Sequence, residues 1–136
     1  MDMASIVDVE GIGAKYAQKL KAAGISTTEA LLKKGATPAG RKELAAKSGI
    51  SDTLILEWVN HVDLYRIKGV GSEYSDLLEE AGVDTVVELA QRKAANLLEK
   101  MVAVNNAKKL VRRMPVLSQV EDWVSQAKKL PRIVSY

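Results

Sequence analysis

The amino-acid sequence predicts an all-α fold for this chain of 136 residues. Apolar residues recur at helical spacing within segments bounded by Ser, Thr, Gly and Pro, the residues that begin and end helices. No segment shows the alternation of apolar and polar residues that is typical of a half-buried strand. The third observation is an internal duplication, in which each copy has the pattern of short helices joined by glycine-containing turns.

The duplication is visible at a fixed offset of 58 residues. VEGIGAKYAQKLKAAGISTTEALL begins at Val9, and IKGVGSEYSDLLEEAGVDTVVELA begins at Ile67. The matched pairs are Gly11 and Gly69, Gly13 and Gly71, Tyr16 and Tyr74, Leu20 and Leu78, Gly24 and Gly82, Ile25 and Val83, Thr27 and Thr85, and Leu31 and Leu89. Because chance does not readily give so many matches in one register, the chain contains two copies of one unit.

The second copy shows which residues begin and end the helices of each unit. A helix capped by Ser51 and Asp52 is expected first, with apolar positions at helical spacing from Leu54 to Tyr65. Lys68-Gly69-Val70-Gly71 then interrupts it, because glycines permit backbone angles that residues with a Cβ resist. A new helix is expected from Ser72, as its N-cap, to a C-terminal glycine at Gly82.

Capping signals place the remaining helices. Thr85 with Glu88 and, in the first copy, Ser26 with Glu29 have the spacing of capping boxes, and Thr37-Pro38 begins a helix that runs to about Ser48. The further predicted segments are Ala94–Ala103, Asn106–Met114 up to Pro115, and a C-terminal helix that Ser118 and Glu121 open and Pro131 ends.

The composition excludes several function classes. The chain has no Cys and one His, which removes thiol catalysis, disulfides and metal sites built from Cys or several His. His61 is interpreted as a surface or helix-end residue, and Ser72 and Ser75 have no base near them in the pattern. We therefore expect no enzymatic activity, no metal and no cofactor. No apolar run is long enough to span a bilayer and the N-terminus is acidic, so a cytoplasmic protein without a membrane or small-molecule partner is expected.

Charge is unevenly distributed along the chain, whose net charge is +3. Residues 1–50 carry eight Lys and Arg against five Asp and Glu, residues 51–100 carry five against ten, and residues 101–136 carry seven against two. Two basic ends thus flank an acidic middle, an asymmetry that suggests a polyanionic partner, although solvated surface charge is the commoner explanation.

The glycine pattern resembles the helix-hairpin-helix modules of DNA polymerases and repair nucleases. The resemblance rests on Gly11, Ile12, Gly13, Ala23, Gly24, Ile25, Thr27, Leu31 and their second-copy partners. The whole chain from residue 5 to residue 136 is also similar to an uncharacterised bacterial double helix-hairpin-helix family, a domain of unknown function. The resemblance implies two helix-hairpin-helix units in one compact domain of residues 1–136, with repeat units at about 5–50 and 63–114 and a closing C-terminal helix at about 118–130.

The same resemblance implies sequence-independent contact with the phosphate backbone of nucleic acid. Successive N–H groups at a glycine hairpin that opens a helix form an anion-binding concavity, to which the helix dipole adds positive charge. The expected contacts are Gly11, Ile12, Gly13, Ala14, Lys15, Lys19, Lys68, Gly69, Val70 and Gly71. DNA is the expected partner and structured RNA the alternative.

The flanking charges distinguish the two hairpins. Lys15 and Lys19 follow the first one, whereas Glu73 begins the helix after the second, and an anion at a helix N-terminus competes with phosphate. Phosphate binding and a purely structural turn remain equally open for the first hairpin, and the structural turn is favoured for the second. Two basic clusters offer auxiliary contacts: Lys108, Lys109, Arg112 and Arg113, and Lys128, Lys129 and Arg132.

Two alternatives remain open from the sequence. Trp58 and Trp123 lie in apolar stripes, so core anchors are favoured over base-stacking platforms. A protein–protein interaction adaptor that uses the same scaffold without nucleic acid is the alternative function, because the acidic middle and basic ends would also suit a complementary protein partner.

Overall fold

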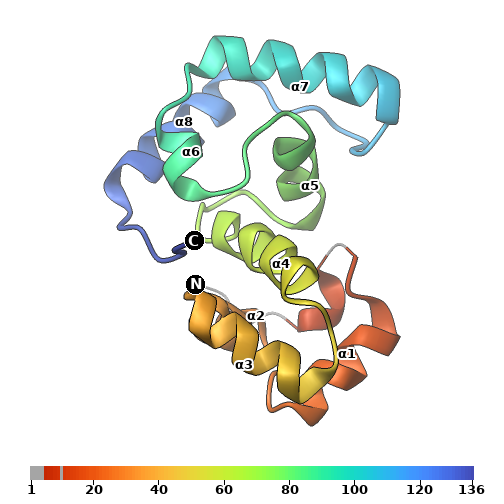
Figure 1. The fold of residues 1–136 in the computed structure, drawn as a ribbon. Coiled ribbons are helices and arrows are strands. Elements are labelled where there is room, and N and C mark those ends of the chain that lie inside the picture. The colour runs from red at the N-terminus through yellow and green to blue at the C-terminus, as the bar shows by residue number, and fades with distance from the viewer. Residues whose placement is uncertain (1–4, 10) are drawn as a thin grey trace. The chain divides into compact units, whose positions relative to one another are not determined.

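The computed structural model describes residues 5–9 and 11–136, and this part of the chain is mostly helical and contains no strand (Figure 1). The elements are a 3-10 helix (Ile6–Asp8), α1 (Gly13–Ala22), α2 (Thr28–Gly35), α3 (Pro38–Ser48), α4 (Asp52–Leu64), α5 (Ser72–Glu80), α6 (Val86–Ala90), α7 (Ala94–Lys108) and α8 (Leu117–Lys129). An isolated bridge pairs Ser5 with Thr27. None of the helices in the described residues combines the length and the apolar character needed to cross a membrane. The expectation of an all-α chain is confirmed.

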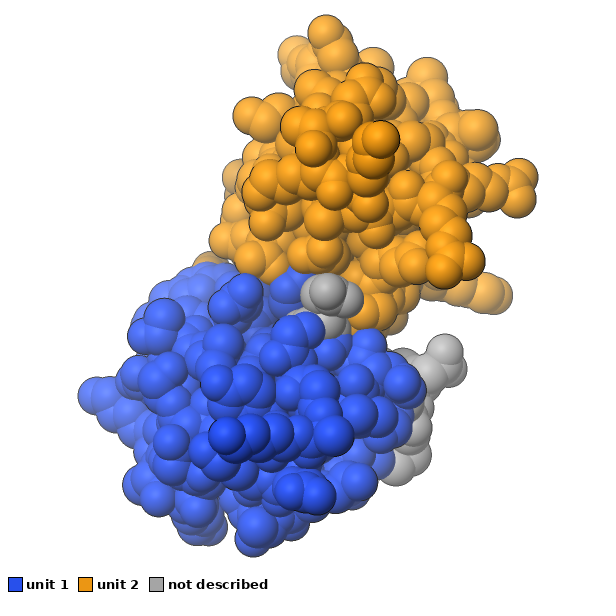
Figure 2. All heavy atoms as spheres, turned by 90° about the vertical axis from the view of Figure 1, so that its right-hand side faces the viewer, with its two compact units in different colours: residues 1–63, 133–136 blue, residues 64–132 orange. Residues whose placement is uncertain are grey.

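The chain divides into two compact units, shown in blue and orange in Figure 2. Unit 1 comprises residues 1–63 and 133–136, and unit 2 comprises residues 64–132. Each unit contains one glycine hairpin and the helices that follow it. That the two units form one domain, with the repeat boundaries expected from the sequence, stays a prediction.

The helix α4 lies in unit 1, apart from Leu64 at its end, whereas the sequence pattern assigned it to the second copy. The reason is a ring contact: Trp58 of α4 packs on Tyr16 of α1, with ring centroids 5.1 Å apart. In unit 2, Trp123 of α8 packs in the same way on Tyr74 of α5, at 5.2 Å. The repeated unit therefore extends to a last helix, α4 in one unit and α8 in the other.

Helices α1 and α5 end in the same glycine motif. Gly24 and Gly82 follow these helices with φ angles of +92° and +96°, a left-handed conformation that glycine adopts without steric cost. The bonds that close the two ends are Gly24 N–H to Lys21 O at 3.0 Å and Ile25 N–H to Leu20 O at 2.9 Å, and Gly82 N–H to Glu79 O at 2.9 Å and Val83 N–H to Leu78 O at 2.8 Å. The predicted role of Gly82 as a C-terminal glycine is confirmed, and its partner Gly24 has the same role.

Threonine side chains cap the N-termini of α2, α3 and α6. The side chains of Thr27, Thr37 and Thr85 accept hydrogen bonds from the N–H groups of Ala30, Gly40 and Glu88, respectively. The predicted caps at Thr37 and Thr85 are therefore confirmed, as is Ser51, whose hydroxyl accepts from Leu54 N–H. The cap expected at Ser26 is wrong, because Thr27 takes that role while the Ser26 carbonyl accepts from Ile6 N–H.

Two further serine caps are corrected. Gly71 is the N-cap of α5, and Ser72 is already helical, its carbonyl accepting from the Ser75 hydroxyl at 2.9 Å. The helix α8 begins at Leu117 rather than after Ser118. Its N-cap is Val116, whose N–H donates to Gln119 Oε1 at 2.9 Å, so a glutamine side chain reaches back to satisfy the orphan donor.

The two short helices expected at 94–103 and 106–114 are also wrong, since α7 is continuous to Lys108 and residues 109–116 are not helical. Asn105 explains the difference. Its side chain accepts from Val111 N–H at 3.0 Å and donates to Val111 O at 3.3 Å, so it fastens the segment after α7 instead of breaking the helix. Lys109 then reverses the chain with a φ of +51°.

Each unit has its own apolar core. In unit 1, buried side chains come from every helix, among them Leu20, Leu31, Leu44 and Ile55. In unit 2, α8 packs against α6 and α7, and α7 packs against α5 (Figure 1). Trp58 and Trp123 are 1% and 2% exposed, so both are core anchors, as the sequence favoured, and neither presents a face for base stacking.

The last residues return to unit 1. Val134 is buried, and Ser135 donates its N–H to Ala36 O at 2.8 Å. Arg41, which is 5% exposed, donates to both Gly35 O and Ser135 O at 2.8 Å. A buried guanidinium thus binds two backbone carbonyls and ties residues 133–136 to α3, an arrangement that charge-assisted hydrogen bonds make stable.

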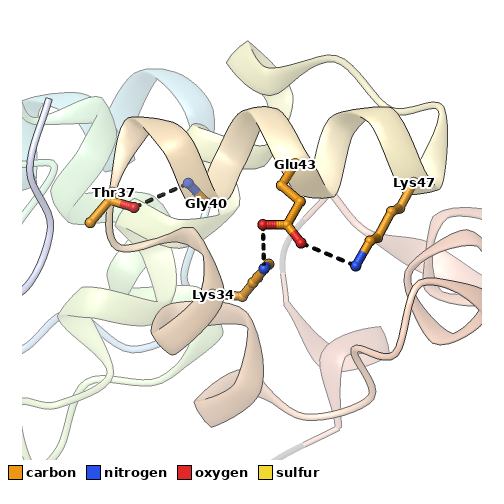
Figure 3. Close-up of polar contacts among 5 residues, drawn as sticks. All are labelled: Lys34, Thr37, Gly40, Glu43 and Lys47. Carbon is orange, nitrogen blue, oxygen red and sulfur yellow. Dashed lines mark hydrogen bonds and ion pairs between the residues drawn. The ribbon is translucent and has the colours of Figure 1, made fainter.

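Glu43 joins two lysines on the surface of unit 1 (Figure 3). Its carboxylate lies 2.8 Å from Lys34 Nζ and 3.1 Å from Lys47 Nζ. The hydrogen bond from Lys34, followed by that from Lys47, lowers the pKa of Glu43 below its usual value. Lys34 and Lys47 are therefore paired with an anion within unit 1.

Candidate nucleic-acid interface

The first glycine hairpin lies just before α1. Gly11 and Gly13 are exposed and have φ angles of +89° and +61°, whereas Ile12 between them is 2% exposed. Ile12 donates its N–H to Val9 O at 3.1 Å, which closes the turn. Its buried side chain pins the turn to the core, so the glycine backbone stays at the surface. Glu10 lies outside the described residues.

The second hairpin repeats this turn before α5. Val70 is buried and donates its N–H to Ile67 O at 3.1 Å, and Gly69 is exposed with a φ of +100°. Gly71 differs from its partner in the first unit, because its φ is −112°, an angle open to any residue. Only the first glycine of this hairpin therefore needs the conformational freedom that the sequence pattern assigned to both.

A buried tryptophan supports each hairpin. A Cβ built on Gly69 would lie 3.1 Å from Trp123 Nε1, and one built on Gly11 would lie 3.4 Å from Trp58 Nε1. At Gly69 the absence of a Cβ thus allows the hairpin backbone to lie close to an indole, whereas the 3.4 Å at Gly11 is an ordinary van der Waals distance. The sequence placed both tryptophans in the core but gave no sign that they lie against the glycines, since the contacts join residues more than 40 positions apart.

The helices that follow the hairpins begin without a side-chain cap. Ile12 and Gly71 are the N-caps of α1 and α5, and neither makes a side-chain cap hydrogen bond. The threonine-capped α2, α3 and α6 differ in this respect. The first-turn N–H groups of an α-helix lack intrahelical partners, so α1 and α5 offer their donors, with the positive end of the helix dipole, to an anion.

Exposed lysines follow the first hairpin on α1. Ala14, Lys15 and Lys19 are exposed on α1. The ammonium of Lys19 lies 5.8 Å from the centroid of the Tyr16 ring, a cation–π contact that holds this charge near the helix start. Of the residues expected to contact phosphate in the first unit, Gly11, Gly13, Ala14, Lys15 and Lys19 are exposed, and the side chain of Ile12 is buried.

The second hairpin has a different set of charges. Lys68 and Glu73 are exposed, and Leu77, which occupies the position of Lys19, is fully buried. A hollow of about 410 Å³ opens beside the hairpin, lined by Gly69, Gly71, Ser72, Glu73, Tyr74, Arg112 and Arg113. Tyr74 donates its hydroxyl to Arg113 O at 2.8 Å, so the segment after α7 is fixed against α5. The positive charges of Arg112 and Arg113 thus line the same hollow as the negative charge of Glu73.

The auxiliary basic clusters separate in the structure. Arg112 and Arg113 lie at the second hairpin, whereas Lys108 forms an ion pair with Glu80 at 2.6 Å. Lys128 lines another hollow, together with Arg92, Lys93 and Glu121. Arg112 and Arg113 are thus members of these clusters that line the hollow beside the second hairpin.

Sequence reasoning missed one residue that holds a hairpin in place. Gln126 of α8 accepts from Lys68 N–H at 2.8 Å and donates to Lys68 O at 3.0 Å. The position three residues after the tryptophan is Gln126 in unit 2 and His61 in unit 1. His61 is 3% exposed, so its interpretation as a surface residue is wrong; it lies in the last turn of α4 as a buried side chain.

Comparison with known proteins gives one match. No curated protein and no solved structure matches the chain. The family model described as Domain of unknown function (DUF4332) matches residues 10–130, which include both hairpins and all eight α-helices. The chain therefore belongs to the DUF4332 family.

Proposed function

We propose that this chain is a tandem helix-hairpin-helix protein that binds duplex DNA through its phosphate backbone, without enzymatic activity and with low sequence specificity. One observation carries the proposal. Each hairpin presents an exposed glycine at the start of a helix that has no side-chain cap. The donors left at such a helix start suit a phosphate oxygen, and the helix dipole favours its charge.

Backbone N–H groups that contact phosphate do not distinguish one base pair from another. Contacts to phosphate fix the position and orientation of a protein on a duplex, whereas sequence is read by side chains at base edges. The exposed cations near the two hairpins, Lys15, Lys19, Lys68, Arg112 and Arg113, would add charge to the same backbone contact. Affinity should then depend strongly on salt and weakly on sequence.

The first experiment is a salt titration on two unrelated duplexes. If three to five phosphates are neutralised, the logarithm of the association constant should fall with the logarithm of salt concentration at a slope of about −0.9 per contact. The two duplexes should give closely similar affinities at each salt concentration. A flat salt response, or a strong preference for one duplex, would contradict the proposed binding mode.

The second experiment exchanges the charges at the two helix starts. Lys15 and Glu73 occupy equivalent exposed positions, so Lys15→Glu should weaken binding and Glu73→Lys should strengthen it. A nearby surface charge contributes about 1 kcal/mol after screening, so each change should be several-fold. Lys42→Glu on α3 makes the same charge change away from both glycine hairpins in the sequence and is the matched control.

Circular dichroism must show that all three variants keep the helix content of the parent chain. If Lys15→Glu and Glu73→Lys both bind duplex DNA as the parent does, neither hairpin is the site. That result would favour the interaction adaptor, which would be recognised by a protein partner that stays bound at high salt.

A further inference from the structure

The side-chain amide of Gln126 pairs with both backbone polar groups of Lys68. Lys68 N–H donates to Gln126 Oε1 at 2.8 Å, and Gln126 Nε2 donates to Lys68 O at 3.0 Å. The arrangement is like the exchange of two hydrogen bonds between paired residues in an antiparallel sheet. It holds the residue that immediately precedes Gly69, the glycine of left-handed φ in this hairpin.

A third contact determines which way this amide faces. Gln126 Nε2 also donates to Asp122 Oδ2 at 2.8 Å, one turn earlier on α8. A flipped amide would place its oxygen against the Asp122 carboxylate and would lose both bonds to Lys68. Asp122, Gln126 and Lys68 therefore form a cooperative set, which we call the amide latch.

The residues of the amide latch are not repeated in the sequence of unit 1. His61 stands where Gln126 would be, and Glu10 stands where Lys68 would be. A neutral imidazole carries its donor and its acceptor on different ring nitrogens, so it cannot reproduce the side-by-side donor and acceptor of an amide. An amide that pairs with both backbone polar groups is therefore a feature of the second hairpin's own sequence.

We propose that Gln126, oriented by Asp122, is a positioning residue that prepares the second hairpin to bind phosphate, an inference that rests on the proposed function. The latch fixes the backbone of Lys68, and with it the direction in which Gly69 and the Lys68 ammonium meet a phosphate. A binding site that is ordered beforehand loses less conformational entropy when its ligand arrives. Removing the latch should therefore weaken duplex binding about three- to tenfold, although Gln126 carries no charge.

The test compares four variants of the full chain. Gln126→Ala removes the latch, and Asp122→Asn replaces the carboxylate that orients Gln126 with an amide that can also donate. Lys68→Ala removes the cation, and Ser125→Ala alters an exposed neighbour on α8 as the matched control. Hydrogen exchange of the Lys68 amide is measured by NMR in the free protein. Affinity for a duplex of about 20 base pairs is then measured over a series of salt concentrations.

We expect Gln126→Ala to accelerate exchange at Lys68 N–H while the amides within α8 stay protected. Its salt slope should also become shallower by about 0.9, as in Lys68→Ala, because the misplaced ammonium no longer neutralises a phosphate. A purely structural role for an uncharged residue would leave that slope unchanged. Asp122→Asn should accelerate exchange at Lys68 N–H to a lesser extent, because an asparagine amide can also pair with a flipped Gln126. Ser125→Ala should resemble the parent chain in both measurements.

The outcomes separate the two proposals. Unchanged exchange at Lys68 in Gln126→Ala would overturn the latch, and faster exchange with parent-like affinity and salt slope would overturn its role in binding. If exchange accelerates but the parent chain binds no duplex, the latch stands as a contact that orders the hairpin and the proposed function fails.

Discussion

Replacement by alanine should affect stability very differently at the two glycines of the second hairpin. Gly69 has a φ of +100°, and a Cβ there would lie 3.1 Å from Trp123 Nε1. Gly71 has a φ of −112°, and a Cβ there would meet nothing within 4 Å. Gly69→Ala should therefore destabilise the chain strongly, and Gly71→Ala is its matched control from the same turn.

The expected magnitude follows from these two geometries. A residue with a Cβ costs about 1–2 kcal/mol in a left-handed conformation. At Gly69 the new methyl group would also press against a buried indole, which would have to give by a few tenths of an ångström, and this raises the total to about 2–4 kcal/mol. At Gly71 the loss of chain entropy in the unfolded state favours alanine, while the N-cap position disfavours it, so the net change should stay within about 1 kcal/mol of zero.

Urea unfolding followed by circular dichroism measures both free energies. Equal slopes of free energy on urea concentration would show that the variants can be compared by their midpoints. Gly69→Ala should unfold at a clearly lower midpoint than Gly71→Ala. If the two midpoints coincide, the strain assigned to Gly69 and its contact with Trp123 is wrong.

Two further predictions concern unit 1. Arg41→Ala removes two charge-assisted hydrogen bonds and leaves the carbonyls of Gly35 and Ser135 without this donor, so unfolding free energy should fall by about 2–4 kcal/mol; a urea midpoint equal to that of the parent chain would refute this role. The contacts with Lys34 and Lys47 lower the folded-state pKa of Glu43, so their stabilisation is present above the unfolded-state pKa and is lost as pH falls through the lowered value. Glu43→Gln should therefore reduce stability at neutral pH and have no such effect well below the folded-state pKa, as urea midpoints at the two pH values would show.

Local signals in the sequence predicted most of the turns and helix ends. Gly24 and Gly82 end helices because a left-handed residue after a helix is strongly favoured to be glycine. Thr37 and Thr85 cap helices because their hydroxyls reach an N–H group three residues on. In both cases the cause lies within a few residues of the signal, which is why the pattern sufficed.

The errors arose where a more distant or competing contact decides the structure. Asn105 resembles a helix breaker, yet its side chain binds Val111 and α7 continues past it. Serines were chosen as caps at positions 26, 72 and 118, although a residue one or two positions away is the N-cap in each case. Capping residues are locally interchangeable, so the spacing of polar residues alone does not choose between adjacent positions.

The sequence predicted where the two glycine hairpins lie, but it did not predict which distant side chains lie beside them. The glycine pattern placed both hairpins at the starts of helices, as the structure has them. Arg112, Arg113 and Gln126 reach the second hairpin from segments 40 to 60 residues further along the chain. Such contacts depend on how helices pack within the unit, and neither periodicity nor capping spacing carries that information.

The distribution of the two tryptophans has a practical consequence. Trp58 lies against the first hairpin and Trp123 against the second, and the chain has no other tryptophan. Trp58→Phe would leave an intrinsic fluorophore that reports on the second hairpin, and Trp123→Phe would leave one that reports on the first. Because indole emission responds to its surroundings, titrating the two single-tryptophan proteins would reveal the occupancy of each hairpin separately, without an attached dye.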